Sequence, residues 1–252
     1  MSIVLLPNNV WTSSAQTDIT DTSNVSIAAD APNFENMAGG PRSLAFTSSG
    51  TGALRAVYVN KAGTLEATHV ILARADLHSG KALDVRSWTS YPSTSVQEYN
   101  YPSFAETLVG RNSQDFVATL GATGKQALGM SFTSTYTKTI TKMFFSSGLT
   151  LPNSQGTQVQ YLGFPSRYTY KRQTYLIDER WRFAFVGISR DDVAAFEAIP
   201  NLMSEPMFVY DSTGDQIPCK LLHGIITDRR VASFADDLHT LTISMDMLRQ
   251  WA

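Results

Sequence analysis

The chain has 252 residues, and its 20 Lys and Arg nearly balance its 22 Asp and Glu, for a net charge of −2. This balance leaves no basic field to hold a phosphate backbone, so no nucleic-acid specificity is expected. Charged residues make up 17% of the chain, below the usual share of about a quarter, and much of the polar content is uncharged Ser, Thr, Asn and Gln. The composition favours stacked β-sheets whose surfaces meet other protein.

Little in the sequence supports a redox, membrane or catalytic role. Cys219 is the only cysteine, so neither an internal disulfide nor a cysteine-pair zinc site can form. The first apolar run, residues 3–6, is too short for a signal peptide or a membrane span, so we expect synthesis in a cytoplasm without membrane insertion. The four histidines stand at no metal-ligand spacing, and nucleophile-elbow and zinc-protease motifs are missing. We therefore expect no enzyme activity, no metal and no cofactor.

The first half of the chain has the pattern of many short strands. Alternating segments between turn signals predict strands at 54–60, 67–77, 83–91, 115–121, 127–135 and 139–146. Residues 60–64 are a plausible hairpin loop between the first two. Closely spaced turn signals of this kind are typical of a β-sandwich or jelly roll. The Gly-, Pro-, Ser- and Gln-rich segment 147–167 is the best linker candidate, so we expect two domains, 1–152 and 153–252.

The second half begins with a long strand at 173–187, whose alternating pattern predicts one buried face. Glu179 interrupts that face, which predicts a bend or an edge. Ser189 then suits a helix N-cap, and the acidic residues after it suit the first turn of a short helix that Pro200 ends.

The last strand shows the clearest alternation in the chain, with apolar residues on one face and Thr240, Thr242, Ser244 and Asp246 on the other. A strand of this kind is a candidate assembly edge through which copies of a subunit pair. It could equally be a central strand of its own sheet.

Aromatic residues are frequent in the first domain, including Trp88, Tyr91, Tyr99, Tyr101 and Phe104, and several of them lie in predicted loops, as in residues 90–104. Aromatic rings in the loops of a sandwich can stack on sugars or anchor a protein contact. These residues are therefore candidates for protein interaction or glycan contact. The structural alternative is that they cover the ends of the sandwich.

Two parts of the chain resemble proteins of long-tailed bacteriophages. The pattern of strand, short helix, strand, loop and strand in QTYLIDERWRFAFVGISRDDVAAFEAI, PMFVYDSTG, CKLLHGI and LHTLTISMDML resembles tail-tip and baseplate proteins, including distal tail and lambda-like minor tail proteins. The stretches ALRAVYVNKAGTLEATHVILARADL and TKTITKMFFS resemble a galactose-binding-like jelly roll found in phage structural proteins.

The resemblance implies a mainly β protein with two domains like β-sandwiches or jelly rolls, the second with one short flanking helix. In those phage families, subunits pack side by side into a ring that continues the tail tube. The resemblance thus implies a ring of copies, a hexamer by analogy with distal tail proteins, in contact with other tail proteins. The long antiparallel hairpin of many tube-forming subunits is not evident in the sequence, which leaves a peripheral adaptor place open.

Two hypotheses about function follow. The leading one is a structural protein of a phage tail tip or baseplate, made in the host cytoplasm and located in the virion tail. It would connect the tail tube to hub or receptor-binding parts, with host surface glycans as candidate further partners. The alternative is a stand-alone carbohydrate-binding module that uses loop aromatics such as Tyr91, Tyr99 and Tyr101 as a stacking platform.

Overall fold

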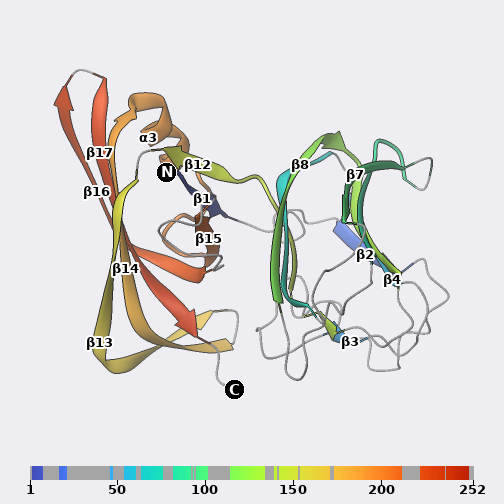
Figure 1. Cartoon of the computed structure of the whole chain (residues 1–252), viewed down its shortest axis with the longest axis horizontal. Coiled ribbons are helices and arrows are strands. Elements are labelled where there is room, and N and C mark those ends of the chain that lie inside the picture. The colour runs from blue at the N-terminus through green and yellow to red at the C-terminus, as the bar shows by residue number, and fades with distance from the viewer. Residues whose placement is uncertain are drawn as a thin grey trace. The chain divides into compact units, whose positions relative to one another are not determined.

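Antiparallel strands make up most of the described chain, and the expected mainly β fold class is confirmed. The computed structural model describes residues 2–7, 17–21, 46–47, 54–60, 64–75, 82–91, 93, 95–101, 114–133, 139–140, 142–152, 154–170, 173–211, 222–235 and 237–249. The chain divides into two compact units (Figure 1). We call residues 1–8 with 148–252 the sheet unit, and residues 9–147 the sandwich unit. The first eight residues thus belong with the C-terminal part of the chain, which differs from the expected domains 1–152 and 153–252.

The sheet unit is built on one seven-stranded antiparallel sheet. Its strands, in spatial order, are β12 (Leu149–Pro152), β1 (Ser2–Leu6), β15 (Met207–Asp211), β16 (Leu222–Ala235), β17 (Leu238–Arg249), β14 (Gln173–Ser189) and β13 (Ser154–Tyr170). From Trp181 onward the predicted apolar face of β14 forms the centre of the core, where Phe183 and Phe185 are fully buried, while Tyr175 and Ile177, before a bulge, belong to a separate cluster. Phe183 and Phe185 belong to one cluster with residues of β1, β12, β15, β16 and β17, so the apolar N-terminal run is a strand of this core.

The segment expected to be a linker, 147–167, is part of this sheet. Leu149–Pro152 pairs with β1, and β13 pairs with β14 over most of its length. Most described residues of β13 are exposed on both faces, so the strand lacks the alternation that reveals a half-buried strand.

Glu179 lies at a bend, as predicted from its interruption of the apolar face. The pairing of β14 with β17 shifts register between Ile177 and Arg180, which marks a bulge. The Glu179 side chain is 6% exposed and its Oε2 accepts a hydrogen bond from the indole Nε1 of Trp181 at 3.1 Å. The hydrogen bond gives this buried carboxylate a partner.

The short helix α3 (Arg190–Glu197) is confirmed with the predicted cap. The Ser189 Oγ accepts a hydrogen bond from the Asp192 backbone N–H at 3.1 Å, and the Asp192 Oδ2 accepts one from the Ser189 backbone N–H at 3.1 Å. This capping box satisfies two backbone donors at the helix start. Val193 and Phe196 are buried and join the core of the sheet unit, so α3 packs onto that core.

Replacing Ser189 by alanine is expected to destabilise the sheet unit by about 1 kcal/mol, because one cap acceptor is lost. Urea unfolding followed by circular dichroism measures the change. Asp191→Ala is the matched control: it removes a first-turn acid outside the capping box and should cost only a few tenths of a kcal/mol. Equal costs for the two variants would contradict the role given to Ser189.

The sandwich unit contains two main antiparallel sheets. The larger contains, in spatial order, β2 (Thr17–Asp21), β4 (Leu54–Asn60), β9 (Ala127–Thr133), β6 (Ala82–Trp88) and β7 (Val96–Tyr101), and the smaller contains β11 (Lys142–Ser146), β5 (Leu65–Ala75) and β8 (Gln114–Lys125). β3 (Phe46–Thr47) and β10 (Thr139–Ile140) form a further short pair. The expected hairpin around 60–64 is wrong, because β4 and β5 belong to different sheets.

The buried histidine of the sandwich unit predicts a loss of stability in acid. His69 is 6% exposed and its Nδ1 lies 2.7 Å from the Thr68 Oγ1. Burial lowers the pKa of the His69 imidazole below its ordinary value of 6.5, so the unfolded chain binds this proton more readily than the folded chain. The stability that the neutral ring provides is present above pH 6.5 and is lost as the pH falls towards and through the folded pKa.

Urea unfolding at pH 7.5 and at pH 5.0 measures this effect, whose slope for one proton is at most about 1.4 kcal/mol per pH unit. His69→Gln should reduce the difference between the two pH values. An unchanged pH dependence in that variant would show that another group is responsible.

Candidate functional site

The candidate assembly edge, β17, is a central strand. It lies between β16 and β14 and pairs with both, so its backbone groups are already used within the chain. The alternation was interpreted correctly as one buried face, but Thr240, Thr242, Ser244 and Asp246 cannot form an edge. The assignment of β17 as an edge is therefore wrong, and the alternative, a central strand, is the one observed.

These four residues instead belong to the polar face of the sheet. The Asp246 carboxylate, 11% exposed, receives two hydrogen bonds from Arg180 across the strands, Nε to Oδ1 at 2.7 Å and Nη2 to Oδ2 at 3.3 Å. This hydrogen-bonded contact raises the pKa of the Arg180 guanidinium. The pair therefore neutralises two charges on this face, where neighbouring Thr and Ser carry none.

The first open edge of the sheet is β13. The strand has 17 residues and pairs only with β14 among the described strands, so its outer side is a sheet margin. Arg167 is its single charged residue, while Val159 is 41% exposed and Tyr161 73%. A long, nearly uncharged edge lacks the charges with which proteins ordinarily prevent strand pairing.

The other end strand of the sheet is the four-residue β12, and a further open edge is the distal part of β16. β15 pairs with β16 only at Leu222–Gly224, while β16 continues to Ala235. Beyond Gly224, no described strand lies on the side of β16 away from β17. Val231 is 41% exposed there, so this part of the strand extends past the core.

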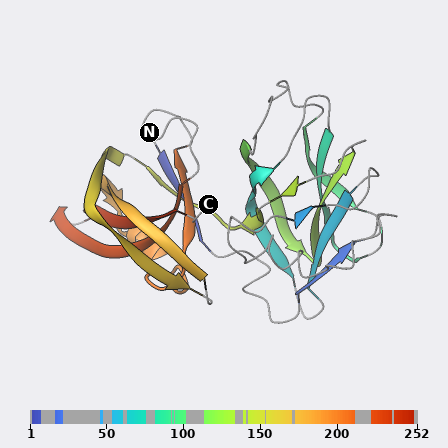
Figure 2. The same cartoon turned by 90° about the horizontal axis from the view of Figure 1, so that it is seen from below.

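Together, β16, β17, β14 and β13 form a four-strand segment with an open edge on each side. Its strands form two long antiparallel hairpins, β16–β17 and β14–β13, which curve along the sheet in both views (Figure 1 and Figure 2). One row of paired residues, Asp228, Ser244, Arg182 and Gln158, crosses the whole segment. The structure therefore contains long antiparallel hairpins that are not evident in the sequence.

The aromatic candidates do not form one platform in the described residues. Trp88 is 3% exposed and packs edge-on against Tyr91, with ring centroids 5.5 Å apart. Because its ring is buried, Trp88 offers no exposed face on which a sugar could stack. Tyr91 is half-buried. Tyr99 and Tyr101 pair with Val85 and Leu83 in the backbone of the larger sheet, but their side chains lie outside what the structure describes, as does the whole of Phe104.

Tyr91 is fixed in place by the turn between β8 and β9. Its backbone N–H donates to the Gln126 Oε1 at 2.6 Å, and the Gln126 backbone N–H donates to the Trp88 carbonyl at 2.7 Å. These contacts join the segment after β6 to the start of β9, so the half-buried Tyr91 ring has a fixed position beside a buried indole. The pattern of aromatics alone does not reveal which ring is held at the surface.

The described residues contain no cluster of His, Cys, Asp and Glu that could hold a metal ion. In the same part of the chain, no helix has the length and apolarity required to cross a bilayer.

No protein-family model and no curated protein sequence matches the chain. Among solved structures, it is similar to a GH29 fucosidase of Ruminococcus gnavus in complex with fucose, at 9% identity and a TM-score of 0.43, over 56% of this chain and 26% of that one. It is also similar to a chitosan-binding module of a Paenibacillus chitosanase/glucanase, at 11% identity and a TM-score of 0.43, over 56% of this chain and 99% of the module.

A third similar structure is a CBM32 module produced by Clostridium perfringens, in complex with GlcNAc-alpha-1,4-galactose, at 12% identity and a TM-score of 0.40, over 56% of this chain and 95% of the module. The chain thus spans about a quarter of the fucosidase and nearly all of each binding module. Similarity at these identities and TM-scores establishes neither a common function nor a common binding site.

Proposed function

We propose that the chain is a structural subunit that assembles with copies of itself into a ring, in the tail tip or baseplate of a long-tailed bacteriophage. One observation carries the assembly: the four-strand segment of the sheet unit has two open edges, β13 on one side and distal β16 on the other. In the ring, the β13 edge of one copy pairs with the β16 edge of the next. The tail setting rests on the sequence resemblance.

The two edges favour a ring over a two-fold dimer. They are different strands on opposite sides of one segment, so a contact between β13 and β16 is head-to-tail and leaves one open edge on each copy. Head-to-tail contacts close into a ring when their rotation adds up to a full turn. The twist and curvature of the strands supply such a rotation. Pairing also gives the edge N–H and C=O groups protein partners in place of water.

Residues exposed on the two edges suit this contact. Val159 and Tyr161 would contribute apolar area from β13, and Val231 from β16. The charges of distal β16 are partly neutralised by ion pairs within the chain. The Arg229 Nη1 lies 2.9 Å from the Glu197 Oε1, and the Arg230 Nε lies 3.1 Å from the Asp228 Oδ2. Few unpaired charges would therefore have to lose water on assembly.

Electron microscopy and sedimentation of the purified chain, alone and mixed with other tail proteins, test the proposal. We expect one closed oligomer, a hexamer if the analogy with distal tail proteins holds.

Disulfide cross-linking tests the contact between β13 and β16. In a chain that carries Cys219→Ser, the substitution Ala232→Cys on β16 is combined in turn with a single cysteine at each of positions 157–161 on β13. One or two neighbouring pairs should form disulfides between copies, whereas Ala232→Cys with Val96→Cys should not. A strict monomer in every mixture would refute the proposal.

Glycan contact by the sandwich unit is a second candidate, favoured by the half-buried Tyr91 ring that Gln126 and Trp88 hold in place. A glycan array separates the two functions. Binding of the wild-type chain that Tyr91→Ala abolishes, while the oligomer stays intact, would support glycan contact beside assembly. Binding by a monomer that never assembles would favour the stand-alone carbohydrate-binding module instead.

A further inference from the structure

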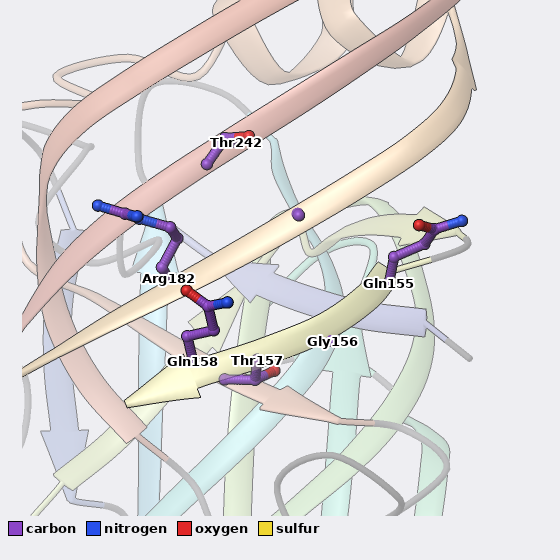
Figure 3. Close-up of a pocket in the computed structure, with 7 residues that line it drawn as sticks. Gln155, Gly156, Thr157, Gln158, Arg182 and Thr242 are labelled. Carbon is purple, nitrogen blue, oxygen red and sulfur yellow. The ribbon is translucent and has the colours of Figure 1, made fainter. Parts of the chain in front are cut away.

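A polar hollow of about 460 Å³ lies on the face of the sheet that points away from the core of the sheet unit (Figure 3). It spans three strands: Gln155, Gly156 and Gln158 come from β13, Arg182 and Ala184 from β14, and Thr242 from β17. The neighbours Phe183 and Phe185 point the other way, into the core. The hollow is therefore on the polar face of the sheet, and part of its wall comes from the edge strand β13.

A bulge in the edge strand creates the hollow. Ser154 pairs with Phe185 and Thr157 with Phe183, so two residues of β13 lie opposite Ala184 alone. Gly156, one of the two, has φ +115°, a conformation that residues with a side chain rarely adopt. Ala184 supplies a small floor, and Thr242 lies directly opposite it on β17. Larger polar side chains surround this floor.

The side chains around the floor offer one cation and several neutral hydrogen-bonding groups. Gln158 lies directly across from Arg182, and Gln155 is the other residue of the bulge (Figure 3). Among the described residues, no carboxylate lies within ion-pair distance of Arg182, whereas the neighbouring Arg180 is neutralised by Asp246. The hollow thus combines an uncompensated guanidinium with amides and a hydroxyl, which donate and accept hydrogen bonds.

We propose that this hollow binds a small carboxylate that also carries hydroxyl groups, of the chemical class of the sugar acids. The planar fork of Arg182 matches a carboxylate with two parallel hydrogen bonds. The amides of Gln155 and Gln158 and the hydroxyl of Thr242 pair with the ligand hydroxyls. The proposal does not rest on ring assembly, because the ligand would bind side chains on the polar face, whereas assembly would pair the free backbone groups of β13.

Nuclear magnetic resonance of the labelled chain tests this, with sodium glucuronate, glucose and sodium sulfate as probes. Glucuronate should shift the Arg182 Nε–H and the side-chain amides of Gln155 and Gln158 in a saturable way. Glucose, without the carboxylate, and sulfate, without the hydroxyls, should each bind at least about tenfold more weakly. If sulfate binds with the same affinity as glucuronate, the hollow is a simple anion site and the proposal is overturned. No saturable shift with glucuronate would overturn it outright.

Variants separate the site from general effects on the sheet. Arg182→Gln should weaken glucuronate binding at least about tenfold, while Arg182→Lys should retain part of it, since a point charge replaces the fork. Ala184→Leu fills the floor without removing a polar group and should also prevent binding. Gln160→Ala, two residues along β13 and paired with Arg180 outside the hollow, is the control that should leave affinity unchanged. Wild-type affinity in Ala184→Leu, with unchanged thermal unfolding, would place the ligand elsewhere and overturn the proposal.

Discussion

A chain that carries Val159→Lys together with Tyr161→Lys is expected to stay folded but to lose ring assembly. The two side chains are 41% and 73% exposed on the open edge of β13, so the folded chain should lose no more than about 0.5 kcal/mol of stability for each substitution. In the ring, two ammonium groups would be buried against distal β16, whose Arg229 and Arg230 are already ion-paired with Glu197 and Asp228. Burying an ammonium group without a partner opposes the contact strongly.

Sedimentation velocity should therefore show monomer at concentrations where the wild-type chain is fully assembled, a weakening of at least about a hundredfold. Val96→Lys is the matched control, because Val96 is 54% exposed on β7, the end strand of a sheet in the sandwich unit. That variant should assemble normally. Assembly of the double variant at wild-type concentrations would refute pairing through β13, whatever the behaviour of the control.

Phe183→Ala is expected to have the largest effect on stability. The Phe183 side chain is fully buried and stacks on Trp181, with ring centroids 6.3 Å apart, at the centre of the core of the sheet unit. Truncating a buried phenylalanine costs about 3–5 kcal/mol, from lost apolar burial and the cavity left behind. This is a large share of the roughly 5–15 kcal/mol that stabilises a whole domain.

Denaturant unfolding followed by tryptophan fluorescence measures this cost. Leu238→Ala is the control, since it removes a 41% exposed apolar side chain from the central strand β17 of the same sheet and should stay within about 0.5 kcal/mol of the wild type. In Phe183→Ala the assembly should be lost as well, because β14 carries both the core and the pairing with β13. A cost of about 1 kcal/mol or less would mean that β14 does not anchor this core.

How much the sequence could predict depended on how each element is buried. The period of two in β14 and β17 revealed both strands, and it placed Trp181, Phe183 and Phe185 of β14 correctly in the main core. It did not reveal that the bulge after Ile177 puts Tyr175 and Ile177 in a separate cluster. Helix α3 was predicted with its cap because capping depends on residues three apart. The polar edge strand β13 has exposed residues on both faces and no clear period, and it was taken for a linker.

The candidate sites illustrate the same limit. Alternation in β17 shows that one face is buried, but it does not show which strands pair with the backbone on either side. Trp88 was a candidate for ligand contact, yet the sheet buries it under Tyr91. The hollow at Ala184 depends on a two-residue bulge in β13 and on residues of three strands, so no short motif could have indicated it.

The sequence by itself determined the local features of this protein: its mainly β character, the buried face of the long strands, and the capped helix that follows Ser189. Each of these depends on residues close together in the chain. Only the tertiary structure decided that β1 joins the C-terminal sheet, that β17 is central, and that β13 and distal β16 are the open edges of the four-strand segment. The physical reason is that strand order follows from backbone pairing between distant segments, and those hydrogen-bonding groups are the same in almost every residue.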